Sequence, residues 1–204
     1  MILVVCAVAD ELRAFVPRRD VEIIAVGVGP VEAALGTARA LAGRHVTLAV
    51  NAGIGGGFRA RTKIGDAVAV TESHYVDLGL EGGGAVHLPG GIVIADRVGA
   101  DAKLLARYAK IPRAILGVGV TSATITTSDE RAHELETRYS PTSEAMEGFS
   151  VLRAAQLARI PAIELRGISN FVGNRAASNW DFRAGAAAVV AMLESFIDSF
   201  ALRG

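Results

Sequence analysis

The sequence predicts an α/β protein: a three-layer α/β/α sandwich with a central mixed sheet. Residues 2–8 and 46–51 are nearly continuous apolar runs, which is typical of strands that helices cover on both faces. Segments with helical spacing of apolar residues alternate with these runs. The 204 residues contain no fixed-period repeat and no break in composition, so we expect one domain over residues 1–204.

The first half of the chain adds strands, a helix and two glycine-rich segments. Residues 21–26 predict a short strand, and Pro30 suits the first turn of a helix. The apolar stripe of that helix comprises Val31, Ala34, Leu35, Ala38 and Leu41. The run 46–51 ends at Asn51. We expect loops at 53–57 and 77–84, with a strand through Val70 between them.

The second half continues the alternation. Residues 100–109 are expected to be helical, and residues 114–121 and 123–127 to be strands. Residues 129–139 read as an exposed helix that Ser128 caps. A strand over 161–168 precedes a last helix, which begins near Phe182. The apolar stripe of the last helix comprises Val189, Met192, Leu193, Phe196 and Phe200.

Composition narrows the class of function. Lys and Arg number 21, as do Asp and Glu, and no basic cluster occurs, which disfavours nucleic-acid binding and favours a small-molecule partner. The longest uncharged run, 114–128, is shorter than the ~20 residues of a spanning helix, so we expect no membrane association. A start without a basic leader and a single cysteine, Cys6, predict a cytoplasmic protein without a disulfide.

Several common kinds of site are disfavoured. Gly27-x-Gly29 is followed by Glu32 instead of a third glycine, and Asn51 stands where a dinucleotide site needs an acidic residue. No Gly-x-Ser-x-Gly elbow occurs. The histidines lack the spacing of metal ligands, so we expect neither metal nor cofactor. They are His45, His74, His87 and His133.

Three stretches place polar groups where strands end: residues 7–11 with Glu11, residues 145–148 with Glu147, and residues 166–170 with Asn170. Each has a structural alternative, since Asp10 and Glu11 could favour a first helical turn, Glu147 could be solvated, and Asn170 could be a cap. Ligands of open α/β sheets bind at the carboxyl ends of the strands. The convergence therefore favours a ligand site.

At these residues the chain resembles the nucleoside phosphorylase and nucleosidase superfamily, in particular the branch of methylthioadenosine/S-adenosylhomocysteine nucleosidases and futalosine hydrolases. The resemblance covers nearly the whole chain. Its ordered motifs are residues 7–11, Gly27-Val28-Gly29 with 33–36, 51–56, Ile64-Gly65-Asp66, Met146-Glu147-Gly148 and Ile168-Ser169-Asn170. Residues 77–83 and 144–149 look most like the futalosine hydrolases, which act in menaquinone biosynthesis.

The resemblance implies a hydrolase that cleaves the N-glycosidic bond of a 6-oxopurine nucleoside, with futalosine as substrate and hypoxanthine as a product. Glu11 and Asn170 would be catalytic: Glu11 corresponds to the water-activating carboxylate, and Asn170 faces the N7 edge of the purine. Glu147 would bind the ribose hydroxyls. The other substrate-binding residues would be Gly55, Met146, Arg166, Ser169 and Trp180. A homodimer or larger homo-oligomer is implied, because superfamily members commonly complete the pocket with a neighbouring subunit.

The chemistry fits these residue types. Cleavage develops positive charge on the sugar, which carboxylates stabilise. The amide NH₂ of Asn170 matches the two acceptors of hypoxanthine, N7 and O6, whereas the adenine-specific sister enzyme carries an aspartate. Ile54 departs from the sister's serine near the water, so the water would depend on Glu11, Arg166 and backbone groups. The segment between the first two strands is also shorter here, which alters the pocket rim.

Alternatives remain. A purine nucleoside phosphorylase would need arginines that converge on phosphate, for which Arg13, Arg59 and Arg61 are candidates. Against it, Glu11 and Asn51 stand where phosphorylases carry phosphate-binding residues. A methylthioadenosine/S-adenosylhomocysteine nucleosidase is a second alternative. A non-catalytic nucleoside-binding domain would be expected to lose Glu11 or Glu147, and both are present.

Overall fold

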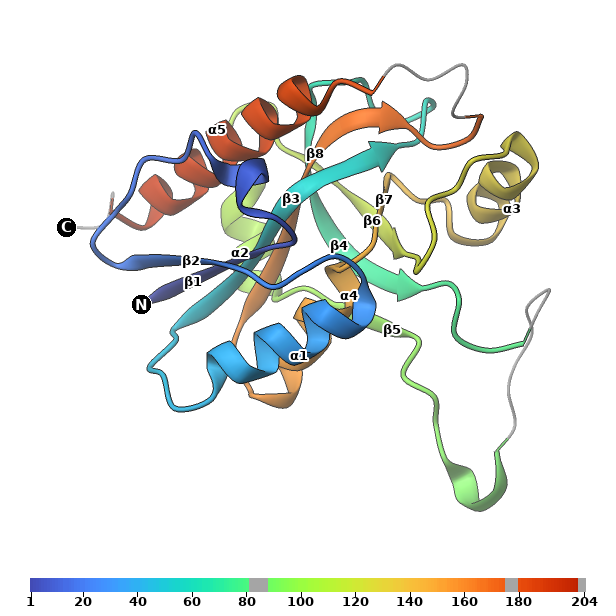
Figure 1. Cartoon of the computed structure of the whole chain (residues 1–204), viewed down its shortest axis with the longest axis horizontal. Coiled ribbons are helices and arrows are strands. Elements are labelled where there is room, and N and C mark those ends of the chain that lie inside the picture. Colours follow the sequence, from blue (N-terminus) through green and yellow to red (C-terminus); the bar gives the residue numbers. More distant parts are fainter. Residues whose placement is uncertain (81–87, 175–179, 202–204) are drawn as a thin grey trace.

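The protein forms a mixed sheet covered by helices on both faces, which confirms the predicted α/β/α sandwich (Figure 1). The computed structural model describes residues 1–80, 88–174 and 180–201. Its strands are β1 (Ile2–Cys6), β2 (Val21–Ala25), β3 (Leu48–Gly57), β4 (Ala67–Tyr75), β5 (Arg97–Gly99), β6 (Ile115–Thr121), β7 (Ser143–Ala145) and β8 (Ala162–Phe171). Its helices are α1 (Pro30–Leu41), α2 (Ala102–Tyr108), α3 (Asp129–Tyr139), α4 (Gly148–Leu157) and α5 (Phe182–Ala201), with short 3₁₀ turns η1 (Ala9–Leu12) and η2 (Pro89–Gly91).

The sheet is partly closed on itself. β2, β1 and β3 are parallel neighbours, and β3 continues in parallel pairing with β8. From β8 the pairing passes to β4 (antiparallel), β6 (parallel), β7 (parallel) and back to β3 (antiparallel). These five strands therefore make a closed ring of pairings, and β5 extends it from β4. Closure brings the ends of β7 and β8 to the two sides of β3.

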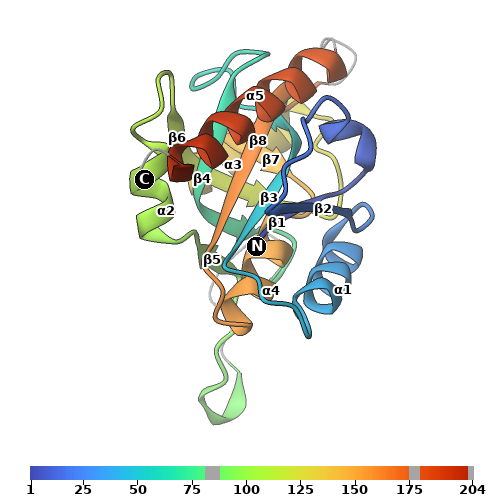
Figure 2. The same cartoon turned by 90° about the vertical axis from the view of Figure 1, so that its left-hand side faces the viewer.

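Both faces of the central strands are buried. Leu3 and Val5 of β1 face α1 and α4, whereas Val4 and Cys6 face the side covered by α5 and α2. Figure 2 shows α5 on one side of the sheet and α1 with α4 on the other. This double burial explains why residues 2–8 form a continuous apolar run instead of an alternating one. The predicted stripe of α5 packs inward, with Leu193 and Phe196 fully buried.

The glycine-rich segment 53–57, which we expected to be a loop, is instead the second half of β3. It pairs with β8 from Gly53 to Gly57, so the strand does not end at Asn51. A Cβ on Gly53 would lie 2.6 Å from the Glu11 Oε1 atom, and one on Gly55 would lie 2.8 Å from the backbone oxygen of Glu144. The glycines permit close approach of functional groups to a strand.

Other expectations were less accurate. Residues 123–127 do not form a strand but a connection between β6 and α3, and the three-residue strands β5 and β7 were not predicted. The Ser128 cap of α3 is present, with its Oγ accepting from the backbone N–H of Arg131 at 3.2 Å. Of the second glycine-rich stretch, residues 81–84 lie outside the described residues, as does His87.

Within the described ranges, no helix combines the length and the apolar character that crossing a bilayer requires.

Candidate active site

A cavity of about 420 Å³ opens where several strands end. Its walls come from the residues that follow β1, the connection after β6, the segment after β7, and the last residues of strand β8. This is the edge of the sheet at which α/β proteins bind ligands, as the polar groups at strand ends predicted.

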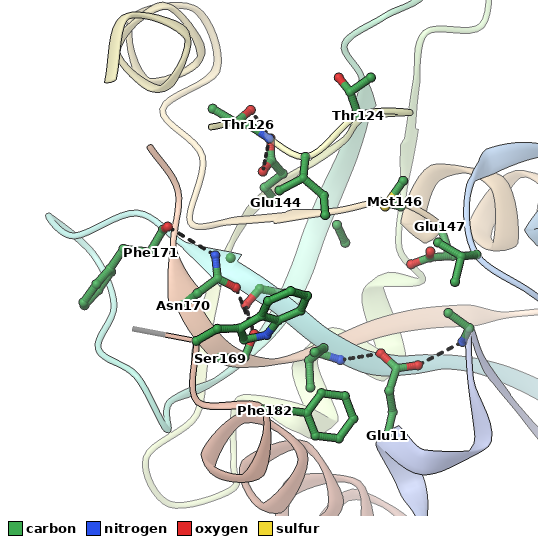
Figure 3. A pocket seen from close by; sticks show the side chains of 18 of the residues that line it. Glu11, Thr124, Thr126, Glu144, Met146, Glu147, Ser169, Asn170, Phe171 and Phe182 are labelled. Atoms are coloured by element: carbon green, nitrogen blue, oxygen red, sulfur yellow. Dashed lines mark hydrogen bonds between the residues drawn. The ribbon is translucent and has the colours of Figure 1, made fainter. Parts of the chain in front are cut away.

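Seven of the eight expected site residues line this one cavity. They are Glu11, Gly55, Met146, Glu147, Ser169, Asn170 and Trp180. The three polar groups on which the functional hypothesis depends therefore share one space (Figure 3). Their roles stay predictions.

Arg166, the eighth expected residue, is not on the cavity wall. It is 1% exposed and lies behind the wall among carboxylates. Its Nε donates to Glu164 at 2.9 Å, its Nη1 lies 3.4 Å from a Glu147 oxygen, and its Nη2 donates to the Asn51 side chain. Arg166 therefore contacts Glu147 from behind the cavity wall, and its expected part in substrate binding stays a prediction.

Glu11 is held firmly by backbone groups. The turn η1 directs its side chain back over β1, where one oxygen accepts from the N–H groups of Ala7 and Val8, each at 3.1 Å. The other oxygen accepts from the N–H of Ile54 at 2.9 Å. Burial raises the pKa of the Glu11 carboxyl, although Arg166 and the N–H groups of Ile54 and Val8 lower it. A carboxylate with a raised pKa is a better proton acceptor near neutral pH.

Glu147 stands at the start of α4 and is buried. One of its oxygens accepts from the backbone N–H of Gly29 at 3.1 Å, and the other faces Arg166. The Gly27-Val28-Gly29 motif thus contacts Glu147 instead of binding a pyrophosphate. Because a carboxylate has about four acceptor positions, Glu147 can still accept from a ligand in the cavity.

Asn170 lies at the other end of the cavity and has a defined orientation. Its Oδ1 accepts from the Ser169 hydroxyl at 2.9 Å, and its Nδ2 donates to the backbone oxygen of Phe171 at 3.2 Å (Figure 3). The amide nitrogen has a second N–H with which it can bind a ligand. Trp180, which is 52% exposed, and Phe182 add aromatic surface to the cavity lining.

Sequence reasoning missed a third carboxylate on the cavity wall, that of Glu144. Glu144 is 7% exposed and lines the cavity, and both of its oxygens accept from Thr126. Burial raises the pKa of the Glu144 carboxyl, and the bonds from Thr126 oppose that rise. The only sequence signal for Glu144 was its position in the stretch 144–149. Its place on the cavity wall could not be predicted, because it depends on the antiparallel pairing of β7 with β3.

The site is acidic. Three carboxylates, from Glu11, Glu147 and Glu164, surround the buried guanidinium of Arg166. Burial raises the pKa of Glu164, although Arg166 lowers it. Across the described part of the chain, no group of three or more His, Cys, Asp or Glu side chains is arranged to hold a metal ion.

Comparison with known proteins places this geometry in context. The family model of the phosphorylase superfamily matches residues 4–201. The futalosine hydrolase of Streptomyces coelicolor is 37% identical over an alignment of 177 residues, and the match covers 78% of this chain and 71% of that protein. The methylthioadenosine/S-adenosylhomocysteine nucleosidase of Colwellia psychrerythraea is 30% identical over 166 residues, 76% of this chain and 68% of that protein.

Solved structures share the fold. The native structure of futalosine hydrolase from Helicobacter pylori superimposes with a TM-score of 0.82 at 19% identity, covering 97% of both chains. The methylthioadenosine/S-adenosylhomocysteine nucleosidase of the same organism, in complex with a substituted pyrrolidin-3-ol, gives a TM-score of 0.82 at 20% identity, again over 97% of both chains.

Proposed function

The chain belongs to the phosphorylase superfamily, and we propose that it is a nucleosidase that hydrolyses the N-glycosidic bond of a 6-oxopurine nucleoside. Futalosine is the proposed substrate, because futalosine hydrolases are among the relatives at 36–37% identity. The products would be hypoxanthine and dehypoxanthine futalosine, in menaquinone biosynthesis in the cytoplasm.

The observation that carries this proposal is the arrangement of Glu11, Glu147 and Asn170 around one cavity of about 420 Å³. Hydrolysis of a nucleoside has three requirements: a base for water, an anchor for the ribose, and donors for the departing purine. The cavity offers one polar side chain suited to each. Figure 3 shows the two carboxylates toward one end and the carboxamide toward the other, the order that a sugar joined to a base requires.

In the proposed reaction, the ionised Glu11 accepts a proton from water that attacks C1′ of the ribose. The bond from C1′ to N9 of the purine breaks, and its electron pair leaves with the base. Since three backbone N–H groups fix the Glu11 carboxylate, its orientation does not have to be established at the moment of reaction. The negative charge also stabilises the oxocarbenium character of the sugar.

Glu147 would accept hydrogen bonds from the ribose hydroxyls. The contact with Arg166 and the bond from Gly29 hold its carboxylate at the start of α4, where it borders the cavity. Charge-assisted hydrogen bonds of this kind are about twice as strong as neutral ones. They would place C1′ above the water that Glu11 binds.

Asn170 would donate the N–H that is not bound to Phe171 to the N7 and O6 edge of the base, where negative charge develops as the bond to the sugar breaks. The Ser169 hydroxyl occupies Oδ1, so the NH₂ end of the carboxamide is the end available to the base. Adenine presents an amino donor at position 6, which would oppose that NH₂. This orientation supports a 6-oxopurine over the 6-aminopurine of the methylthioadenosine/S-adenosylhomocysteine nucleosidases, the principal alternative.

Water is favoured over phosphate as the nucleophile, because none of the described residues that line the cavity is Lys or Arg. Of the arginines considered for phosphate binding, Arg61 pairs with Glu136 at 3.1 Å and Arg59 stacks over Phe171 at 4.1 Å. Arg13 is exposed and does not line the cavity. A phosphate dianion would therefore sit beside Glu11 without a cation to compensate it.

The test is an assay of futalosine, inosine and methylthioadenosine, each with and without inorganic phosphate. We expect hypoxanthine release from futalosine at the same rate with or without phosphate, and little adenine release from methylthioadenosine. Product formation that requires phosphate would replace this proposal with a phosphorylase, and preferred cleavage of methylthioadenosine would replace it with the sister nucleosidase.

We also propose a homodimer or larger homo-oligomer. Val28 lines the cavity and is exposed, and on the adjacent helix α1 Val31 and Leu35 are 67% and 65% exposed. Exposed apolar side chains of this size beside a cavity support a protein interface there.

A further inference from the structure

We propose that Glu144 is a second specificity-determining residue, which accepts a hydrogen bond from N1–H of the 6-oxopurine while Asn170 binds N7 and O6. This assignment rests on the proposed function, because it names the group that reads the second edge of the same base. Neither the motifs that point to Glu11, Glu147 and Asn170 nor the cavity geometry used above gives Glu144 a role.

The strand register places Glu144 and Asn170 on either side of one glycine. In the β3–β7 pairing Gly56 is opposite Glu144, and in the β3–β8 pairing Gly56 is opposite Asn170. Since neighbouring strands are about 4.8 Å apart, the two backbones are separated by about 10 Å. A Cβ on Gly56 would lie 3.3 Å from Asn170 Nδ2, so the absence of a side chain keeps the space beside the carboxamide open.

Thr126 fixes Glu144 as an acceptor. The Thr126 N–H donates to Oε2 at 3.2 Å, and its hydroxyl donates to Oε1. Each carboxylate oxygen retains acceptor capacity, and the side chain borders the cavity. Figure 3 shows Glu144 and Thr126 on the wall toward Asn170, away from Glu11. The position fits a contact with the base better than one with C1′.

The chemistry of the two edges is complementary. In hypoxanthine, O6 lies between N7 and N1, so a base that presents N7 and O6 to Asn170 presents N1–H to the adjoining wall. An acceptor is required there, and Glu144 supplies one. In adenine N1 is itself an acceptor, which would face the carboxylate and lose its hydrogen bond. Two independent mismatches would then reject adenine, one at each side chain.

The experiment measures calorimetric dissociation constants for the free bases hypoxanthine, 1-methylhypoxanthine and adenine. Free bases avoid any dependence on the 5′ substituent or on turnover. The variants are Glu144→Gln, which preserves shape, and Glu130→Gln, a matched control on the exposed face of α3. The parent and the control should bind hypoxanthine at least about tenfold more tightly than 1-methylhypoxanthine, the ratio that a hydrogen bond to a charged group supports.

Glu144→Gln removes the negative charge and replaces one carboxylate oxygen with an NH₂ group, which cannot accept from N1–H. Hypoxanthine should then bind at least about tenfold more weakly, the penalty for N1-methylation should shrink to about twofold, and adenine should gain relative to hypoxanthine. Because Gln has the size of Glu, a purely steric effect of the methyl group would persist. An unchanged ratio of hypoxanthine to 1-methylhypoxanthine would overturn the assignment and leave Glu144 as an anchor for Thr126.

Thr126→Val provides a second route, since it removes only the hydroxyl that orients Glu144. We expect the same change in selectivity to be smaller, about threefold. If both variants keep the parent's selectivity while the parent still hydrolyses 6-oxopurine nucleosides, the Glu144 assignment fails alone. If the selectivity follows Glu144 but no nucleoside is hydrolysed, the proposed function fails and base recognition stands.

Discussion

At the scale of single residues, the carboxylates of the site are firmly oriented by hydrogen bonds, and their close approach in a buried region is electrostatically unfavourable. Glu11, Glu147 and Glu164 share one buried guanidinium, that of Arg166, so their negative charge exceeds the positive charge beside them. Such an arrangement is unfavourable for stability and is typical of functional sites. Binding of a sugar that develops positive charge would relieve part of this imbalance.

Glu11→Gln tests the general base. The variant keeps the shape of the side chain but cannot accept the proton of the attacking water, so kcat for futalosine should fall by about 10²–10⁴-fold. Steady-state kinetics measure the loss, and calorimetry with hypoxanthine provides the control. Base binding should remain near that of the parent, because Glu11 lies at the sugar end. A kcat within a few-fold of the parent would exclude Glu11 as the base.

The pH dependence follows from the raised pKa of Glu11. Only the ionised carboxylate accepts a proton, so kcat/KM should fall as the pH decreases through that pKa. Since burial raises the pKa of Glu11 above the ordinary value of a glutamate, the decline should begin at a higher pH than an exposed glutamate would produce. The profile of kcat/KM reports the free enzyme. Activity that stays constant down to pH 4.5 would contradict this role.

Asn170→Asp should move the preference toward 6-aminopurines. A protonated aspartate can donate to N7 and also accept from an adenine amino group, whereas the carboxamide directs an N–H donor to the base while its Oδ1 accepts from Ser169. The ratio of kcat/KM for methylthioadenosine to that for futalosine should rise at least about tenfold. Ser169→Ala is the companion variant, in which Asn170 loses its orienting bond but keeps its donors. An unchanged ratio in Asn170→Asp would show that this residue does not face position 6.

At the scale of elements, the sequence identified the buried strands and the helices but not the closure of the sheet. The apolar runs of β1 and β3 and the stripe of α5 were legible, because burial on one or two faces leaves a periodic signal. β5 and β7 are only three residues long, too short for such a signal. The prediction for residues 53–57 was wrong because a run of glycines is typical of a loop. In this strand the glycines instead allow neighbouring groups to approach closely, which the sequence alone does not reveal.

The sequence also predicted part of the candidate site but not all of it. Glu11, Glu147 and Asn170 follow or end strands, so the rule for ligand sites in α/β sheets brought them together. The burial of Arg166 behind the cavity wall was not predicted, because the inward direction of its side chain depends on the pairing of β8 with β3 and β4. Glu144 was missed for the corresponding reason in β7, whose antiparallel register no local pattern encodes.

Gly55→Ala tests the interpretation of β3. The added methyl would meet the backbone oxygen of Glu144 at 2.8 Å, and backbone yields less readily than a side chain. The β3–β7 contact should be disturbed, with a loss of about 1–3 kcal/mol in unfolding free energy and a larger loss of activity. Gly99→Ala in β5 is the matched control, because its Cβ meets only an oxygen at 3.9 Å. Equal stability of both variants in urea titrations would contradict the close-approach argument.

At the scale of the whole molecule, one end of the sheet provides the chemistry and an adjoining apolar rim suggests assembly. Val31→Glu on α1 tests the second point. A charge on this surface should shift the mass in solution from homo-oligomer toward monomer, and futalosine turnover should fall if a neighbour completes the pocket. Light scattering coupled to size exclusion measures the shift. Arg39→Glu, at an exposed position on the same helix, is the control. A parent that is monomeric at assay concentration would refute the assembly.

The central claim is that two carboxylates and one carboxamide surround a single bound nucleoside. A crystal structure of Glu11→Gln soaked with futalosine measures this directly, because the variant should bind substrate without consuming it. We expect Glu147 within hydrogen-bond distance of the ribose hydroxyls, Asn170 at N7 and O6, and residue 11 beside C1′. A nucleoside bound elsewhere, or with its base next to residue 11 and its ribose next to Asn170, would contradict the account.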